Sequence, residues 1–97
     1  MSTNHPLPRD FIGTVRVIAD TADDLLVQAR IGTPGQVTER LVRFYVSTQP
    51  LDAPTKDGRE AIYGALQLAK LVAVRVLLSG GLSLSRIKEI VAAADIV

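Results

Sequence analysis

The chain has 97 residues, enough for one domain with a hydrophobic core. Its composition, 47% hydrophobic and 22% charged, is that of a globular domain and excludes a disordered tail. The absence of cysteine excludes disulfides, thiolate chemistry and cysteine-based zinc sites, and we expect a cytoplasmic protein. The net charge of +1 excludes a strongly basic protein, so any nucleic-acid surface must come from clustered charges.

The charges are unevenly distributed along the chain. Residues 30–59 contain five basic and three acidic residues, which gives +2. Residues 1–24 contain two basic and four acidic residues, which gives −2. The middle of the chain is therefore the part whose charge suits a polyanionic partner.

The N-terminal segment 1–10 contains His5 and two prolines, and we expect a flexible arm there, before a single domain over 11–97. Polar residues and glycines interrupt the apolar run 66–84, so no transmembrane helix is predicted. A lone histidine without cysteine makes no metal site, and nothing assembles a nucleophile, a base and an oxyanion donor. We therefore expect no enzyme, metal or cofactor.

Residues 11–19 are apolar and β-branched, which fits a short strand or an extended segment packed on the domain. Thr21 is expected to cap a first helix, with Asp23-Asp24 in its first turn. Gly32 and Pro34 are expected to end this helix. Its predicted buried face consists of Leu25, Leu26, Ala29 and Ile31.

A second helix is expected from about 36 to 47, and Pro50 prevents its continuation. Spacing predicts a buried stripe of Val37, Leu41, Phe44 and Tyr45. The opposite side is predicted to carry Gln36, Glu39, Arg40 and Arg43. A helix, a turn and a second helix with exposed arginines is how small domains present a helix to a DNA groove.

The Asp57-Gly58 dipeptide within 55–63 predicts a tight hairpin, which would form a small wing. A long helix is expected over 64–79, ended by Gly80-Gly81, and Ser83 is expected to cap a final helix. The apolar positions of this final helix are Leu84, Ile87, Ile90, Val91 and Ala94.

The predicted helix 64–79 is apolar on most sides, with only Gln67, Lys70 and Arg75 as a polar face. Such a helix is either the central core helix or the carrier of a protein–protein surface, and the two roles are compatible. The residues of that candidate interaction surface are Leu66, Val74, Leu77 and Leu78.

Three blocks of the chain resemble the DNA-binding domain of the MerR family of transcription regulators. Residues 40–47, Arg-Leu-Val-Arg-Phe-Tyr-Val-Ser, resemble its recognition helix, and residues 54–63 resemble its wing, which ends in a tyrosine. Residues 81–90, Gly-Leu-Ser-Leu-Ser-Arg-Ile-Lys-Glu-Ile, resemble its Gly-hydrophobic-Ser-Leu segment. The likeness covers about 21–94, so the sensor domain of full-length members is expected to be lacking. Gly35-Gln36 lengthens the turn before the recognition helix relative to the family pattern.

The resemblance implies a mainly α, winged helix-turn-helix fold with about four helices and a two-stranded wing. It implies double-stranded DNA as the partner, with the second helix in the major groove and the wing on the phosphate backbone. The residues expected to contact DNA are Gln36, Thr38, Arg40, Arg43, Tyr45, Lys56 and Arg59. One such domain buries little DNA surface, so self-association or a protein partner is expected. No small-molecule effector is evident.

Two other functions are compatible with the sequence. Short domains of this kind also resemble excisionases, which are architectural factors that bend DNA, and binding to arrayed direct repeats would favour that function. The domain could instead be a protein-interaction module that does not bind DNA. A lack of salt-dependent DNA binding would favour the interaction module.

Overall fold

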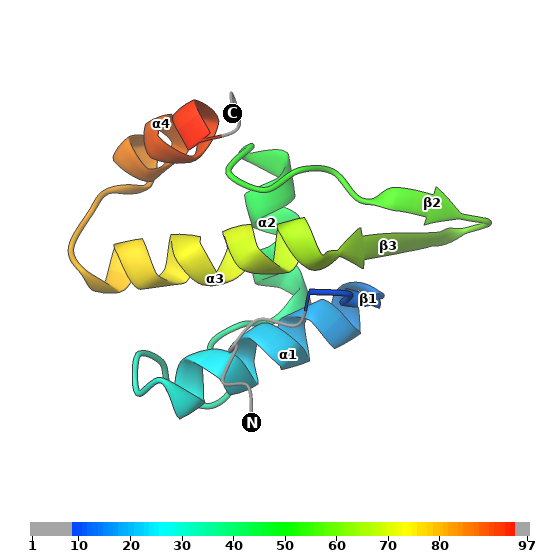
Figure 1. The fold of residues 1–97 in the computed structure, drawn as a ribbon, viewed down its shortest axis with the longest axis horizontal. Coiled ribbons are helices and arrows are strands. Elements are labelled where there is room, and N and C mark those ends of the chain that lie inside the picture. The colour runs from blue at the N-terminus through cyan, green and yellow to red at the C-terminus, as the bar shows by residue number, and fades with distance from the viewer. Residues whose placement is uncertain (1–8, 95–97) are drawn as a thin grey trace.

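The computed structural model describes residues 9–94, except for the side chain of Ala94. The predicted N-terminal arm, with His5, lies outside the described residues apart from Arg9 and Asp10. The described part of the chain forms four helices and three short strands (Figure 1). In chain order these are β1 (Ile12–Gly13), α1 (Val15–Gln28), α2 (Glu39–Ser47), β2 (Thr55–Asp57), β3 (Glu60–Gly64), α3 (Ala65–Ser79) and α4 (Leu84–Ala94).

Helix α3 runs through the middle of the molecule, with α1 and α4 on opposite sides of it (Figure 1). Helix α1 also contacts α2, which lies behind α3 in this view. Strand β3 is central in the sheet and pairs antiparallel with both β1 and β2. The β2–β3 hairpin projects beyond the helices as a wing. The mainly helical, winged helix-turn-helix fold predicted from the sequence is confirmed.

The hydrophobic core joins all four helices. Ile18 of α1, Val42 of α2, Leu68 and Leu71 of α3, and Ile87 of α4 each have 0% exposed surface. Burying an aliphatic side chain of this size stabilises a fold by about 1.5–3 kcal/mol. Because the buried residues come from every helix, the core fixes the position of α2 relative to the rest of the domain.

Helix α1 begins at Val15, so the predicted start at Thr21 is wrong. The β-branched residues that suggested a strand over 11–19 lie mostly in this helix, because Ile18 and Ala22 recur at helical spacing and are buried. Within residues 11–19, the strand is limited to Ile12–Gly13, which pairs with β3. A Cβ at position 13 would lie 2.8 Å from Val17 Cγ1, so the tight passage from β1 into α1 requires glycine.

The end of α1 also differs from the prediction. The helix stops at Gln28, before the predicted end at Gly32, and Arg30 adopts the left-handed conformation that often closes a helix, with a φ of 61°. The N–H of Ile31 then donates to the carbonyl of Leu26 at 2.9 Å. Of the predicted buried face, Leu26 is buried, Leu25 is half-buried, and Ala29 and Ile31 are exposed.

The remaining elements agree more closely with the sequence. Helix α2 ends at Ser47, before Pro50, as predicted, but it begins at Glu39 rather than near residue 36. The hairpin pairs Asp57 with Glu60 across a turn in which Gly58 has a φ of 65°. Helix α3 ends before Gly80, and the hydroxyl of Ser83 accepts the N–H of Arg86 at the start of α4, so both predictions are confirmed.

Candidate nucleic-acid interface

The start of α2 is defined by a side-chain cap. Thr38 has extended backbone angles, and its hydroxyl accepts the N–H of Leu41 at 3.1 Å. Glu39 in the first turn places a negative charge near the positive end of the helix dipole. Helix α2 therefore begins at a fixed residue, directly after the loop from α1.

Helix α2 has two distinct faces. Its buried residues, Val42 and Tyr45, are 0% and 2% exposed. Phe44 is 48% exposed, so its predicted place in the buried stripe is wrong. Val42 and Tyr45 are three positions apart and define the inner face, and Phe44 lies one step around the helix from it. The exposed residues of α2 are Arg40, Arg43, Phe44 and Ser47.

Two residues predicted to contact DNA, Gln36 and Thr38, also shape the loop and the start of α2. The Gln36 side-chain oxygen accepts the N–H of Thr33 at 3.1 Å, which closes the loop on itself. Thr38 is occupied as the N-cap of α2. Both residues are exposed and lie directly before the first turn of α2, so their contact with DNA stays a prediction.

Tyr45 is a core residue rather than a surface contact. Its ring is buried, and its hydroxyl oxygen accepts a hydrogen bond from Arg75 Nη1 at 3.1 Å. The prediction that Tyr45 contacts DNA is therefore wrong for this structure. The tyrosine instead joins α2 to α3 from behind the exposed face.

Arg43 is exposed and paired only at the surface. Its Nη2 atom lies 3.2 Å from Glu39 Oε1, one turn earlier in α2, and the two side chains are 62% and 43% exposed. Exposed ion pairs of this kind contribute about 0–1 kcal/mol, so exchanging Glu39 for a phosphate costs little. Arg40 is exposed on the same helix.

A hollow of about 260 Å³ brings together residues from three elements. Arg43 comes from α2, Lys56 and Arg59 come from the wing, and Thr14 and Val15 come from the start of α1. Three of the predicted DNA-contacting cations therefore line one depression. The remaining lining residues are Glu60, Ala61 and Tyr63.

The electrostatics of this hollow favour an anion. The first backbone N–H groups of a helix have no partner within the helix and carry partial positive charge, and Thr14 makes no side-chain cap at the start of α1. Glu60 is the one acidic residue among those lining the hollow, against three cations. Burial raises the pKa of the Tyr63 hydroxyl, and the charge of Arg43 partly opposes that increase.

The comparison with protein families identifies the family of the chain. The family described as MerR HTH family regulatory protein matches residues 35–94. The chain belongs to the MerR HTH family. The match includes α2, the wing, α3 and α4, whereas α1 precedes it. Searches of curated proteins and of solved structures found no match.

The MerR family is a regulatory DNA-binding family, so the geometry above belongs to a DNA-binding regulatory domain. Sequence reasoning did not identify the start of α1 as part of the hollow. Thr14, a good capping residue just before helically spaced Ile18 and Ala22, was the signal that could have found it. Phe44 was assigned to the wrong face, because the predicted stripe was counted from Val37, which lies before the helix begins at Glu39.

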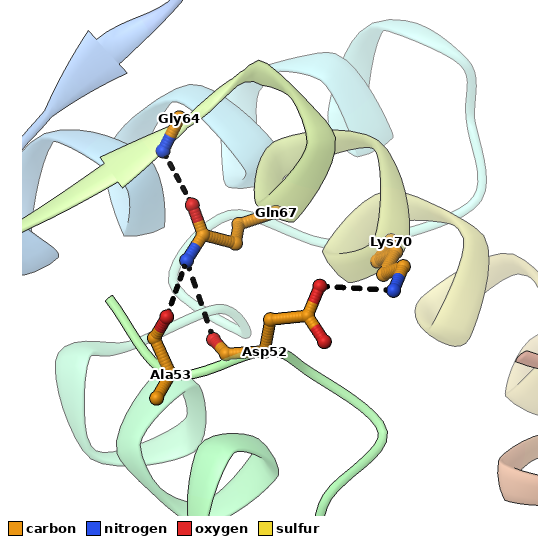
Figure 2. A network of polar contacts seen from close by, with 5 residues as sticks. All are labelled: Asp52, Ala53, Gly64, Gln67 and Lys70. Atoms are coloured by element: carbon orange, nitrogen blue, oxygen red, sulfur yellow. Dashed lines mark hydrogen bonds and ion pairs between the residues drawn. The ribbon is translucent and has the colours of Figure 1, made fainter. Parts of the chain in front are cut away.

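A polar network fixes the link between α2 and the wing in this MerR domain (Figure 2). Gln67 of α3 accepts the N–H of Gly64 at 2.6 Å and donates to the carbonyls of Asp52 and Ala53 at 3.3 and 3.0 Å. Lys70 Nζ, in a side chain only 10% exposed, lies 3.0 Å from Asp52 Oδ2. The segment after α2 and the base of the wing are therefore tied to the same turn of α3.

The predicted interaction surface is only partly exposed. Leu66 is 63% exposed and Leu77 and Leu78 are half-buried, but Val74 is 1% exposed, so its assignment to that surface is wrong. An apolar groove of about 300 Å³ lies between α3 and α4. It is lined by Leu66, Ala69, Lys70, Ala73, Leu77, Ile90 and Val91. No helix within the described residues is long and apolar enough to span a membrane.

Proposed function

We propose that this chain is a sequence-specific DNA-binding transcription regulator of the MerR type, with α2 in the major groove and the β2–β3 wing on the phosphate backbone. The observation that carries this proposal is the convergence of Arg43, Lys56 and Arg59 beside the start of α1. The phosphates of a DNA strand follow one another along its backbone, so cations that gather in one hollow can bind neighbouring phosphates.

The hollow supports phosphate binding. Lys56 and Arg59 stand on either side of Gly58 in the wing, and both are exposed. Arg43 faces them from α2, where only a surface ion pair with Glu39 must be exchanged. Phosphate contacts of this kind set the register of a protein on DNA and carry no sequence information themselves.

The rest of the exposed face of α2 supports base recognition. Arg40 can donate two hydrogen bonds to the O6 and N7 atoms of guanine, the commonest specific contact in the major groove. Phe44 offers an exposed apolar ring on the same face, which suits the methyl group of thymine. Together these side chains would discriminate between sequences, while the hollow would hold the backbone.

Titration of fluorescent duplexes tests this function. We expect the wild-type protein to bind a duplex selected from a randomised pool more tightly than a scrambled one, and to weaken as salt increases. The double variant Arg40→Ala/Arg43→Ala should lose this preference. Arg86→Ala is the matched control, because Arg86 is 65% exposed and pairs with Glu89 at 3.2 Å, but lies on α4. Binding that does not depend on salt, or that R40A/R43A retains, would contradict the proposal.

The apolar groove supports a second component of the function, association with another copy of the chain. Helix-turn-helix domains commonly bind two half-sites as pairs, and a single small domain buries little DNA surface. Leu66, at 63%, is the most exposed of the large apolar residues that line the groove. Sedimentation velocity should show concentration-dependent dimers that Leu66→Ser weakens and Ile31→Ser, a change at another exposed apolar residue, does not. A protein that stays monomeric with and without the duplex excludes this association.

A further inference from the structure

The connection between α1 and α2 is unusually long for a helix-turn-helix. It runs over residues 29–38, whereas the usual turn has about three or four residues. A longer connection has more accessible conformations, and ordering it costs more entropy. Without another restraint, the start of α2 would be less well fixed than in a short turn.

One carboxylate supplies such a restraint. Asp23 lies in α1, and its Oδ2 atom accepts the backbone N–H of Gly35 at 2.9 Å. Its Oδ1 atom accepts the backbone N–H of Val37 at 3.0 Å. Both oxygens of one side chain are thus bonded to the last part of the loop before α2, and hydrogen bonds to a charged acceptor are the strong kind.

The surroundings of Asp23 favour its charged form. Burial acts to raise the pKa of the carboxyl, but the N–H groups of Gly35, Val37 and Gln36 and the positive charge of Arg75 outweigh it. The pKa is therefore lower than that of an ordinary aspartate. The sequence predicted Asp23 in the first turn of a helix, where its negative charge would interact favourably with the helix dipole. The structure shows it in the middle of α1, bonded across to the loop.

The residues that Asp23 holds lead directly into α2. Val37 is 5% exposed and precedes Thr38, the N-cap of the helix. In the second half of α2, the hydrogen bond from Arg75 to the Tyr45 hydroxyl attaches the helix to α3. Helix α2 is therefore restrained at both ends, through groups that lie off its exposed face.

We propose that Asp23 is a positioning residue that sets how α2 is presented to DNA, acting through the loop and not by touching DNA. This role rests on the DNA-binding function proposed above. Gly35 is exposed, so its N–H can bind water when the carboxylate is removed, whereas the N–H of Val37, a core residue only 5% exposed, loses its partner. Base recognition depends on the placement of side chains, whereas attraction to phosphates does not. Loss of Asp23 should therefore reduce discrimination between sequences more than it reduces binding in general.

The test compares Asp23→Ala and Asp23→Asn with Asp24→Ala. Asp24→Ala is the matched control, because this substitution removes the same charge from the next position of α1, which is exposed. Asparagine replaces one of the two bonding oxygens by an NH2 group, which cannot accept, so one of the two N–H groups loses its partner. The probes are a duplex selected by the wild-type protein from a randomised pool and a scrambled duplex of equal length. We expect D23A and D23N to lose roughly tenfold in the ratio of the two affinities, the scale of one displaced base contact, and D24A to keep it.

A second measurement detects the hydrogen bonds of Asp23 in the absence of DNA. The amide proton resonances of Gly35 and Val37 should move in D23N and stay in place in D24A, with the rest of the spectrum still that of the folded protein. Equal affinity ratios for D23A and D24A would overturn the role of Asp23 and leave DNA binding standing. If the wild-type protein selects no duplex, the proposed function and this role fail together.

Discussion

Helices α2 and α3 use their polar residues in opposite ways. In α2, Arg40 and Arg43 point to solvent, and the inner face is apolar. In α3, the polar residues Gln67, Lys70 and Arg75 are buried or half-buried and hydrogen-bond to other parts of the chain. Exposed cations are available to a partner, whereas inward polar groups that are already hydrogen-bonded serve the scaffold.

The apolar residues of the two helices differ in the same way. Leu66, Ala73 and Val76 of α3 are exposed, although nearly every residue around them in the helix is apolar. Helix α2 exposes Phe44 beside its arginines. The α2 side thus suits a charged, ordered partner such as DNA, and the outer side of α3 suits an apolar surface.

The largest expected effect is a loss of stability from the core of α3. Leu71 has 0% exposed surface, and Leu71→Ala should lower the free energy of unfolding by about 2–5 kcal/mol. For a domain with a total of about 5–15 kcal/mol, this is a large fraction. Urea denaturation followed by circular dichroism measures it. A change below about 1 kcal/mol would contradict the central role of α3 in the core.

A change on the exposed side of α2 should weaken DNA binding without lowering the stability of the fold. Arg43→Ala should weaken binding to the selected duplex by about 1–3 kcal/mol and leave the free energy of unfolding within about 0.5 kcal/mol of the wild type. Fluorescence anisotropy and urea denaturation on the same preparations measure both quantities. If R43A unfolds more easily and binds DNA normally, α2 is part of the scaffold and not the recognition helix.

The wing should contribute affinity without discrimination. Lys56→Ala/Arg59→Ala should weaken binding to selected and scrambled duplexes equally and reduce the slope of log affinity against log salt by about 2. Titrations at four or more salt concentrations give the slope. An unchanged slope would place the phosphate contacts elsewhere than in the hollow.

The smallest expected effect is a dependence of stability on pH at Asp23. The pKa of this carboxyl is lower in the folded protein than the value of about 3.9 expected for an unfolded chain. Its stabilising contribution is therefore complete above that value and is lost as pH falls through the lower folded pKa. The stability difference between wild type and D23N should narrow between pH 5 and pH 2. Thermal unfolding at each pH measures the difference, and a gap that stays constant or widens would contradict the expectation.

Local signals in the sequence predicted the C-terminal half well. Gly80-Gly81, Ser83 and the Asp57-Gly58 turn mark boundaries through the conformations of single residues, and the structure places the elements there. The start of α1 was missed because the β-branched residues around Val15 fit a strand equally well. Packing of Ile18 into the core decides between the two conformations.

The candidate site was only partly predictable, because its main features join residues far apart in the chain. The bond between Tyr45 and Arg75 spans 30 positions, and that between Asp23 and Gly35 spans 12. No local pattern reveals such partners. The arginines of α2 and the cations of the wing were expected from the family resemblance, but their meeting with the start of α1 in one hollow required the fold.

The most direct test of the central claim is a titration of the isotope-labelled protein with the selected duplex, followed by amide chemical shifts. The difference between α2 and α3 predicts shifts concentrated in Glu39–Ser47, in Thr55–Gly64 and at the start of α1. Val76 of α3, which is exposed and does not line the α3–α4 groove, should keep its amide shift. Shifts confined to the α3–α4 groove, with α2 and the wing unchanged, would contradict the claim that the exposed face of α2 and the wing form the DNA-binding surface.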